Sequence, residues 1–193
     1  MDSDGYLSQL AGIFDGITVL TPSISAIIAI VLAGVLLLAS GFASASEIAF
    51  FSLSPSDRND IDERNHPSDE KISALLGDSE RLLATILITN NFVNVTIIML
   101  CNFFFMNVFI FHSPLAEFLI LTVILTFLLL LFGEIMPKIY SAQKTLAFCR
   151  FSAPGIYYLE KIFRPVATVL VRSTAFLNKH FAKKSHNISV DEL

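Results

Sequence analysis

Three long runs of apolar residues, each with few charges, dominate the chain. They cover residues 24–53, 82–111 and 115–139. Each run exceeds the roughly 20 residues that a helix needs to cross the hydrocarbon core of a bilayer. The pattern therefore predicts an all-α membrane protein with three transmembrane helices.

Shorter polar segments surround these runs. After the first run, Ser54 and Pro55 fit the N-cap and first position of a helix. We expect juxtamembrane helices over 55–76, with a break at 65–67. Asp78 is expected to cap the helix that becomes the second span.

After the third run we expect a further juxtamembrane helix over 145–177, which is amphipathic over 156–176. Basic residues recur at helical spacing on one face, and apolar residues fall on the other. Pro154 and Pro165 are expected to bend or interrupt this helix. Such a helix suits the inner membrane interface or packing against the spans, and both can hold.

The division of the chain follows from these segments. Residues 1–23 are expected to form an extracytoplasmic lead, and 24–177 a transmembrane domain with its juxtamembrane helices. The polar residues 178–193 read as a linker towards a cytoplasmic region that this sequence does not contain.

The charge distribution sets the expected orientation. Hydrophobic residues make up 54% and charged residues 16% of the chain, as in membrane proteins. All 13 Lys and Arg residues fall on one side of the three-span arrangement. The positive-inside rule then places the N-terminus outside and the C-terminus in the cytoplasm.

Other residue types exclude several classes of protein. Cys101 and Cys149 are expected to lie far apart, so we predict no disulfide. No pair of nucleophile and base is recognisable, and the histidines lie outside the spans or in tails. The sequence thus favours neither an enzyme nor a nucleic-acid-binding protein, and its expected surroundings are the lipid bilayer.

The end of the third run carries the most informative polar group, Gly133-Glu134 followed by Pro137-Lys138. Proline lacks an N–H, so in an α-helix Pro137 leaves the carbonyl of Gly133 without its donor. A freed carbonyl beside the Glu134 carboxylate at membrane depth is typical of a hard-cation site. The alternative is a hinge whose carboxylate reaches interfacial water.

The other two runs carry polar groups as well. Ser44 and Glu47 share a face of the first span, and Asn90 and Asn94 lie one turn apart in the second. The alternative reading is helix packing by small residues and hydrogen bonds between helices. That reading leaves Glu47 unexplained, because a carboxylate is costly in a membrane unless it is paired or solvated.

Depth favours one shared site. At ~1.5 Å per residue, Ser44, Asn90 and Gly133 lie roughly 13, 12 and 9 Å from the inner ends of their spans. Hydroxyl, amide, carbonyl and carboxylate oxygens suit Mg²⁺ or Ca²⁺ better than zinc or copper. We therefore expect a cation site that faces the cytoplasm.

Taken together, these motifs resemble the CNNM/CorC magnesium transporter family. They are Ser44-Ala45-Ser46-Glu47, the Asn90–Asn94 cluster, and Phe132-Gly133-Glu134 with Pro137-Lys138. The similarity covers about 24–171, the transmembrane domain of that family. The residue sequences of the second and third motifs also resemble those of a bacterial branch of the family that is associated with gliding motility.

The resemblance implies a homodimer with three spans per subunit in the bacterial inner membrane. It implies Mg²⁺ efflux in exchange for Na⁺, and a missing cytoplasmic pair of CBS modules that would bind ATP. Ser44, Asn90 and the Gly133 carbonyl would be the Mg²⁺ ligands. Glu134, Glu47 and Asn94 complete the candidate metal residues, the carboxylates supplying negative potential. The rival hypothesis is a non-transporting scaffold of a motility or secretion assembly.

Overall fold

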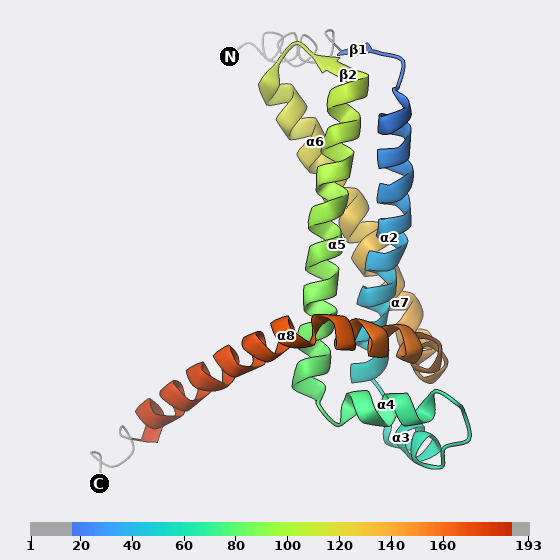
Figure 1. The fold of residues 1–193 in the computed structure, drawn as a ribbon, viewed down its shortest axis with the longest axis vertical. Helices are drawn as coiled ribbons and strands as arrows, with labels where there is room; N and C mark the ends of the chain where they lie inside the picture. The colour runs from blue at the N-terminus through green and yellow to red at the C-terminus, as the bar shows by residue number, and fades with distance from the viewer. Residues whose placement is uncertain (1–16, 187–193) are drawn as a thin grey trace, which may run out of the picture. The chain divides into compact units, whose positions relative to one another are not determined.

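The computed structural model describes residues 17–186, with backbone only for 17, 116 and 174–186. The elements follow in chain order in Figure 1: β1 (Ile17–Val19), α2 (Ile24–Phe51), α3 (Pro55–Asp62), α4 (Asp69–Leu76), α5 (Ser79–Val108), β2 (Phe109–Phe111), α6 (Pro114–Leu128), the π-helix η1 (Leu129–Ile135), α7 (Met136–Gln143) and α8 (Thr145–His186).

Three helical stretches are long and apolar enough to cross a membrane. They are α2, α5 and the combined stretch Glu117–Gln143. The predicted all-α membrane fold with three spans is thereby confirmed. The third span departs from a regular α-helix, because the π-helical segment η1 separates α6 from α7.

The chain folds as two compact units. Within the described residues, the first contains 17–44 and 91–139, and the second contains 45–90 and 140–186. The first unit has an apolar core of small and branched side chains. Its buried members are Ala33, Val93, Ile97, Cys101 and Leu125.

A short strand pair closes the first unit at one end of its helices. β1 and β2 pair antiparallel, with Ile17 opposite Phe111 and Val19 opposite Phe109. The Leu20 N–H also donates to the Val108 carbonyl at 2.7 Å. The apolar pattern predicts no strand in these two segments. Both segments are nevertheless rich in β-branched and aromatic residues, which favour extended backbone.

In the second unit, the predicted helix-start signals are confirmed. Ser54 is the N-cap of α3 with Pro55 in the first turn, and its Oγ accepts from the Asp57 N–H at 3.2 Å. The Asp57 carboxylate accepts the Ser54 N–H at 3.0 Å, which completes a capping box. Asp78 accepts from the Arg81 N–H at 3.2 Å before α5.

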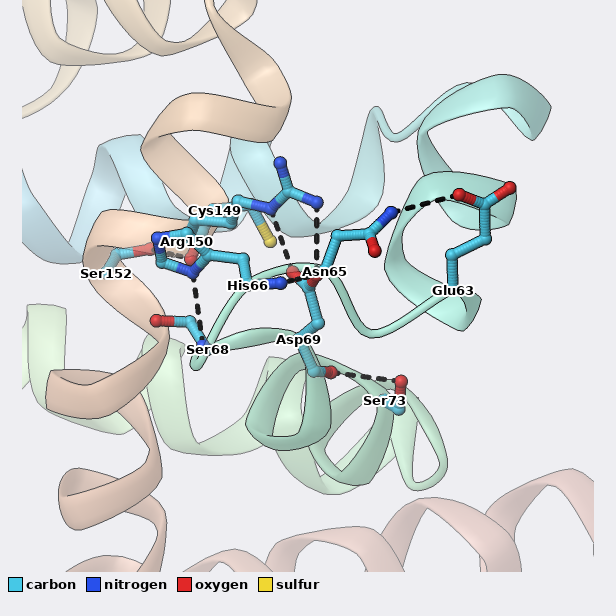
Figure 2. Close-up of polar contacts among 9 residues, drawn as sticks. All are labelled: Glu63, Asn65, His66, Ser68, Asp69, Ser73, Cys149, Arg150 and Ser152. Atoms are coloured by element: carbon cyan, nitrogen blue, oxygen red, sulfur yellow. Dashed lines mark hydrogen bonds and ion pairs between the residues drawn. The ribbon is translucent and has the colours of Figure 1, made fainter.

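A buried ion pair joins α4 to α8. Arg150 donates two hydrogen bonds to the Asp69 carboxylate, at 2.8 and 3.0 Å, and the His66 N–H donates a third at 2.9 Å (Figure 2). The Asp69 side chain is fully buried. Burial alone would raise the pKa of Asp69, but these hydrogen bonds hold it below its usual range.

The long helix α8 differs from its prediction. It continues through Pro154 and Pro165 and reaches His186, beyond the expected end at 177. Each proline removes one backbone hydrogen bond, and the remaining bonds keep the helix continuous. The expected linker is therefore helical up to 186, and residues 187–193 lie outside the described part.

Cys101 and Cys149 are both buried free thiols. Burial raises the pKa of Cys149 to about 12, and the nearby Asp69 carboxylate adds to the effect. Cys149 is therefore a packing residue of the second unit that stays protonated at neutral pH.

Candidate cation site

Close contact between α2 and the third span begins at Gly41. A Cβ added to Gly41 would lie 3.0 Å from Cγ of Pro137 and 3.2 Å from the carbonyl oxygen of Phe132. Such distances are tighter than ordinary van der Waals contact, so a side chain here would push the third span away by a few tenths of an ångström. Gly41 therefore allows the backbone carbonyl of the third span to approach α2, as small residues do between membrane helices.

Ser40 connects all three spanning stretches of the first unit. Its Oγ donates to Oδ1 of Asn94 on α5 at 2.7 Å. A Cβ added to Gly133 would lie 3.1 Å from the same Oγ. Ser40 is buried. The structure thus brings two predicted site residues, Asn94 and Gly133, to one hydroxyl group that the prediction did not include.

The π-helix corrects the predicted carbonyl geometry. In η1 the Met136 N–H donates to the carbonyl of Leu131, five residues back. In that register, the carbonyl facing the nitrogen of Pro137 belongs to Phe132. The prediction of a freed Gly133 carbonyl assumed an α-helical register, which residues 129–135 do not have. The Phe132 oxygen is also the one directed at Gly41.

Ser44 lies one turn beyond Ser40 on α2 and is fully buried. Its Oγ has no hydrogen-bond partner within the part of the chain that the structure describes. An unsatisfied buried hydroxyl costs about 1–3 kcal/mol. Such a group in a native protein calls for an explanation, of which a bound ion or water is the simplest.

Glu134 follows Gly133 and is only partly buried. Its carboxylate accepts a hydrogen bond from Nζ of Lys138 at 3.1 Å, one helical turn further on. These two charged residues near the end of the third span therefore form an ion pair. Lys138 offsets part of the negative potential expected from Glu134.

The remaining predicted residues, Asn90 and Glu47, belong to the second unit. Both are partly buried. Among the side chains that the structure describes, no group of three or more His, Cys, Asp or Glu residues is arranged to hold a metal ion. The candidate donors are instead mainly neutral oxygens.

Ser40, Gly41 and Thr85 were not among the predicted site residues. The small residues of the run from Ser40 to Glu47 indicated close helix approach, but did not single out Ser40 or Gly41. Thr85 had no distinguishing signal: its Oγ1 is buried and unpaired within the described residues, while its carbonyl accepts from Oγ1 of Thr89 at 2.8 Å.

Comparison with known proteins identifies the family. The Cyclin M transmembrane N-terminal domain, CNNM, matches residues 19–193. The chain belongs to the CNNM family. A "UPF0053 protein" of Haemophilus influenzae is 31% identical over 134 residues, which is 69% of this chain and 31% of that protein. The chain thus spans about a third of the length of this curated relative, and covers the transmembrane part of CNNM proteins.

Proposed function

We propose that this CNNM domain transports divalent cations, with Mg²⁺ as its substrate. The observation that carries the proposal is the buried hydroxyl of Ser44, which lacks a partner in the described residues. It lies one turn from Ser40, which holds Asn94 beside Gly133. A buried oxygen kept without a hydrogen bond is available to a cation that has shed water.

The neutral character of the donors agrees with transport. A hydroxyl, an amide and a carbonyl bind Mg²⁺ more weakly than several carboxylates would. A transport site must release its ion, so moderate affinity is an advantage. In this proposal Ser44 binds the ion with a backbone carbonyl of the third span, and the family resemblance implies Asn90 as a further ligand. Glu47 and Glu134 raise the local cation concentration.

The family resemblance also suggests a direction of transport and a coupling ion. We propose Mg²⁺ efflux from the cytoplasm in exchange for Na⁺, in a bacterial inner membrane. The family resemblance also implies a pair of CBS modules that would bind ATP, and we include them in the proposal for the whole protein. The orientation, with the N-terminus outside, rests on the segregation of the 13 basic residues.

A homodimer is part of the proposal. A cleft of about 460 Å³ runs along α5 and α6, and its lining includes Asn102, Glu117, Thr122 and Thr126. These polar side chains lie in spanning helices, where exposure to lipid is unfavourable. A second copy that covers the cleft would shield them, and two-fold symmetry is the commonest arrangement of two identical chains.

Metal-dependent stabilisation of the purified chain tests the proposal. Mg²⁺ should raise the melting temperature of the wild type. Ser44→Ala and Asn90→Ala should each weaken this effect about tenfold in Mg²⁺ concentration, since each removes one oxygen ligand. Asn102→Ala removes an amide outside the proposed site, so this variant should respond to Mg²⁺ like the wild type. If Mg²⁺ affects all four proteins equally or not at all, the scaffold hypothesis replaces transport.

A further inference from the structure

A small hollow lies between the end of α7 and the start of α8, in the second unit. Its volume is about 270 Å³, and it is lined by Tyr140, Lys144, Ala147, Phe148 and Phe151. The proposed cation site does not use any of these residues. The hollow combines one cation with three aromatic rings at the point where the third span ends.

The aromatic rings form an ordered wall. The ring centroids of Tyr140 and Phe148 are 6.4 Å apart at an interplanar angle of 81°, and those of Phe148 and Phe151 are 5.7 Å apart at 64°. The outer two rings remain largely uncovered, with Tyr140 57% and Phe151 70% exposed. Aromatic side chains at the end of a membrane span are suited to contact with lipid.

Lys144 is the charged group of the hollow. Its side chain is exposed and makes no ion pair or hydrogen bond within the described residues. The segment 140–151 that forms the hollow carries Lys144 and Arg150 and no acidic residue. Arg150 is paired with Asp69, so Lys144 supplies the positive charge of the hollow. The hollow thus favours a ligand with a negative head and an apolar body.

We propose that the hollow binds one anionic phospholipid. The lipid phosphate would contact Nζ of Lys144, and an acyl chain would lie against Phe148 and Phe151. A membrane lipid fits better than free phosphate, because free phosphate would leave the exposed rings uncovered. A zwitterionic lipid also carries a positive charge in its headgroup, so Lys144 would attract it less strongly. Bound lipid would tie the α7–α8 corner to one leaflet.

Native mass spectrometry of the whole chain in a non-ionic detergent tests this proposal, since detergent removes the general surface potential of a bilayer. We expect one adduct of dioleoylphosphatidylglycerol per chain, with about fivefold preference over dioleoylphosphatidylcholine. Lys144→Gln should abolish the preference, and Lys144→Arg should retain it. Lys161→Gln is the matched control, because it removes an exposed charge of α8 outside the hollow and should leave the preference intact.

Further measurements test the contact with the acyl chain and the other possible occupants of the hollow. Phe151→Ser should weaken the binding of both lipids, since both have the same acyl chains. The proposal is wrong if Lys161→Gln acts like Lys144→Gln, or if the two lipids bind equally to the wild type. It is also wrong if millimolar inorganic phosphate displaces the lipid, which would indicate a free-phosphate site. If the sample contains dimers and lipid adducts occur only on monomers, a second copy of the chain covers the hollow, and the proposal is wrong.

Discussion

At the scale of residues, the candidate site depends on small side chains that allow close contact. Ser40 donates to Asn94, and an added Cβ would meet its nearest neighbour at 3.0 Å at Gly41 and at 3.1 Å at Gly133. The buried hydroxyl of Ser44 is then left without a partner in the described residues. Space, rather than charge, is what places these oxygens near one another.

Gly41→Ala tests this dependence on space. The new Cβ would lie 3.0 Å from the Pro137 ring and 3.2 Å from the Phe132 oxygen. We expect a loss of about 1–3 kcal/mol of stability, because the third span must move away. Thermal unfolding in detergent measures the change.

Gly34→Ala is the matched control for this variant. It lies on the same helix, and its added Cβ would have nothing within 4 Å. Alanine is the better helix former, so the control should be neutral or more stable by up to about 1 kcal/mol. Equal losses in both variants would contradict the role given to Gly41.

At the scale of elements, the hydrophobic pattern was sufficient to predict the spans, since apolar runs of this length have few other solutions. Caps at Ser54 and Asp78 were also predictable, because they depend on local hydrogen bonds. The π-helix was not, since an extra residue in a turn leaves no periodic signal in an apolar run. The strand pair β1–β2 and the contact of Ser40 with Asn94 join distant segments, which one sequence does not reveal.

The ion pair between α4 and α8 gives a prediction at this scale. Arg150→Gln would leave the fully buried Asp69 carboxylate without its main partner. We expect a loss of about 3 kcal/mol. Asp69→Asn should cost less, because an amide is cheaper to bury than an unpaired carboxylate. Thermal unfolding at neutral pH measures both, and equal stability of the two variants would contradict this role for the pair.

The same pair predicts a pH dependence. The pKa of Asp69 is lowered in the folded protein, so the ionised pair contributes stability above the unfolded pKa of about 3.9. That contribution is lost as pH falls further, through the folded pKa. The difference in melting temperature between wild type and Asp69→Asn should therefore be constant from pH 7 to 5 and shrink below about pH 4. If the difference in melting temperature stays the same below pH 4, the ionised pair does not contribute the stability assigned to it.

At the scale of the whole molecule, three apolar helices and the CNNM match show a membrane protein. Its orientation is a prediction from the distribution of Lys and Arg. A cysteine introduced at Ser113 should react with an impermeant thiol reagent added outside intact cells. One introduced at Asn65 should react only after the membrane is opened. The buried native Cys101 and Cys149 give the background, and the reverse labelling pattern would overturn the orientation.

The central claim is that neutral oxygens of the spanning helices bind the transported cation. Anomalous diffraction from crystals soaked in Mn²⁺, a stand-in for Mg²⁺ with a measurable signal, tests it most directly. The account predicts a peak within coordination distance of the Ser44 hydroxyl and the Asn90 amide oxygen, with a backbone carbonyl of the third span as a further ligand. The same measurement shows whether that carbonyl belongs to Phe132 or Gly133. A peak elsewhere, with water alone beside Ser44, would contradict the account.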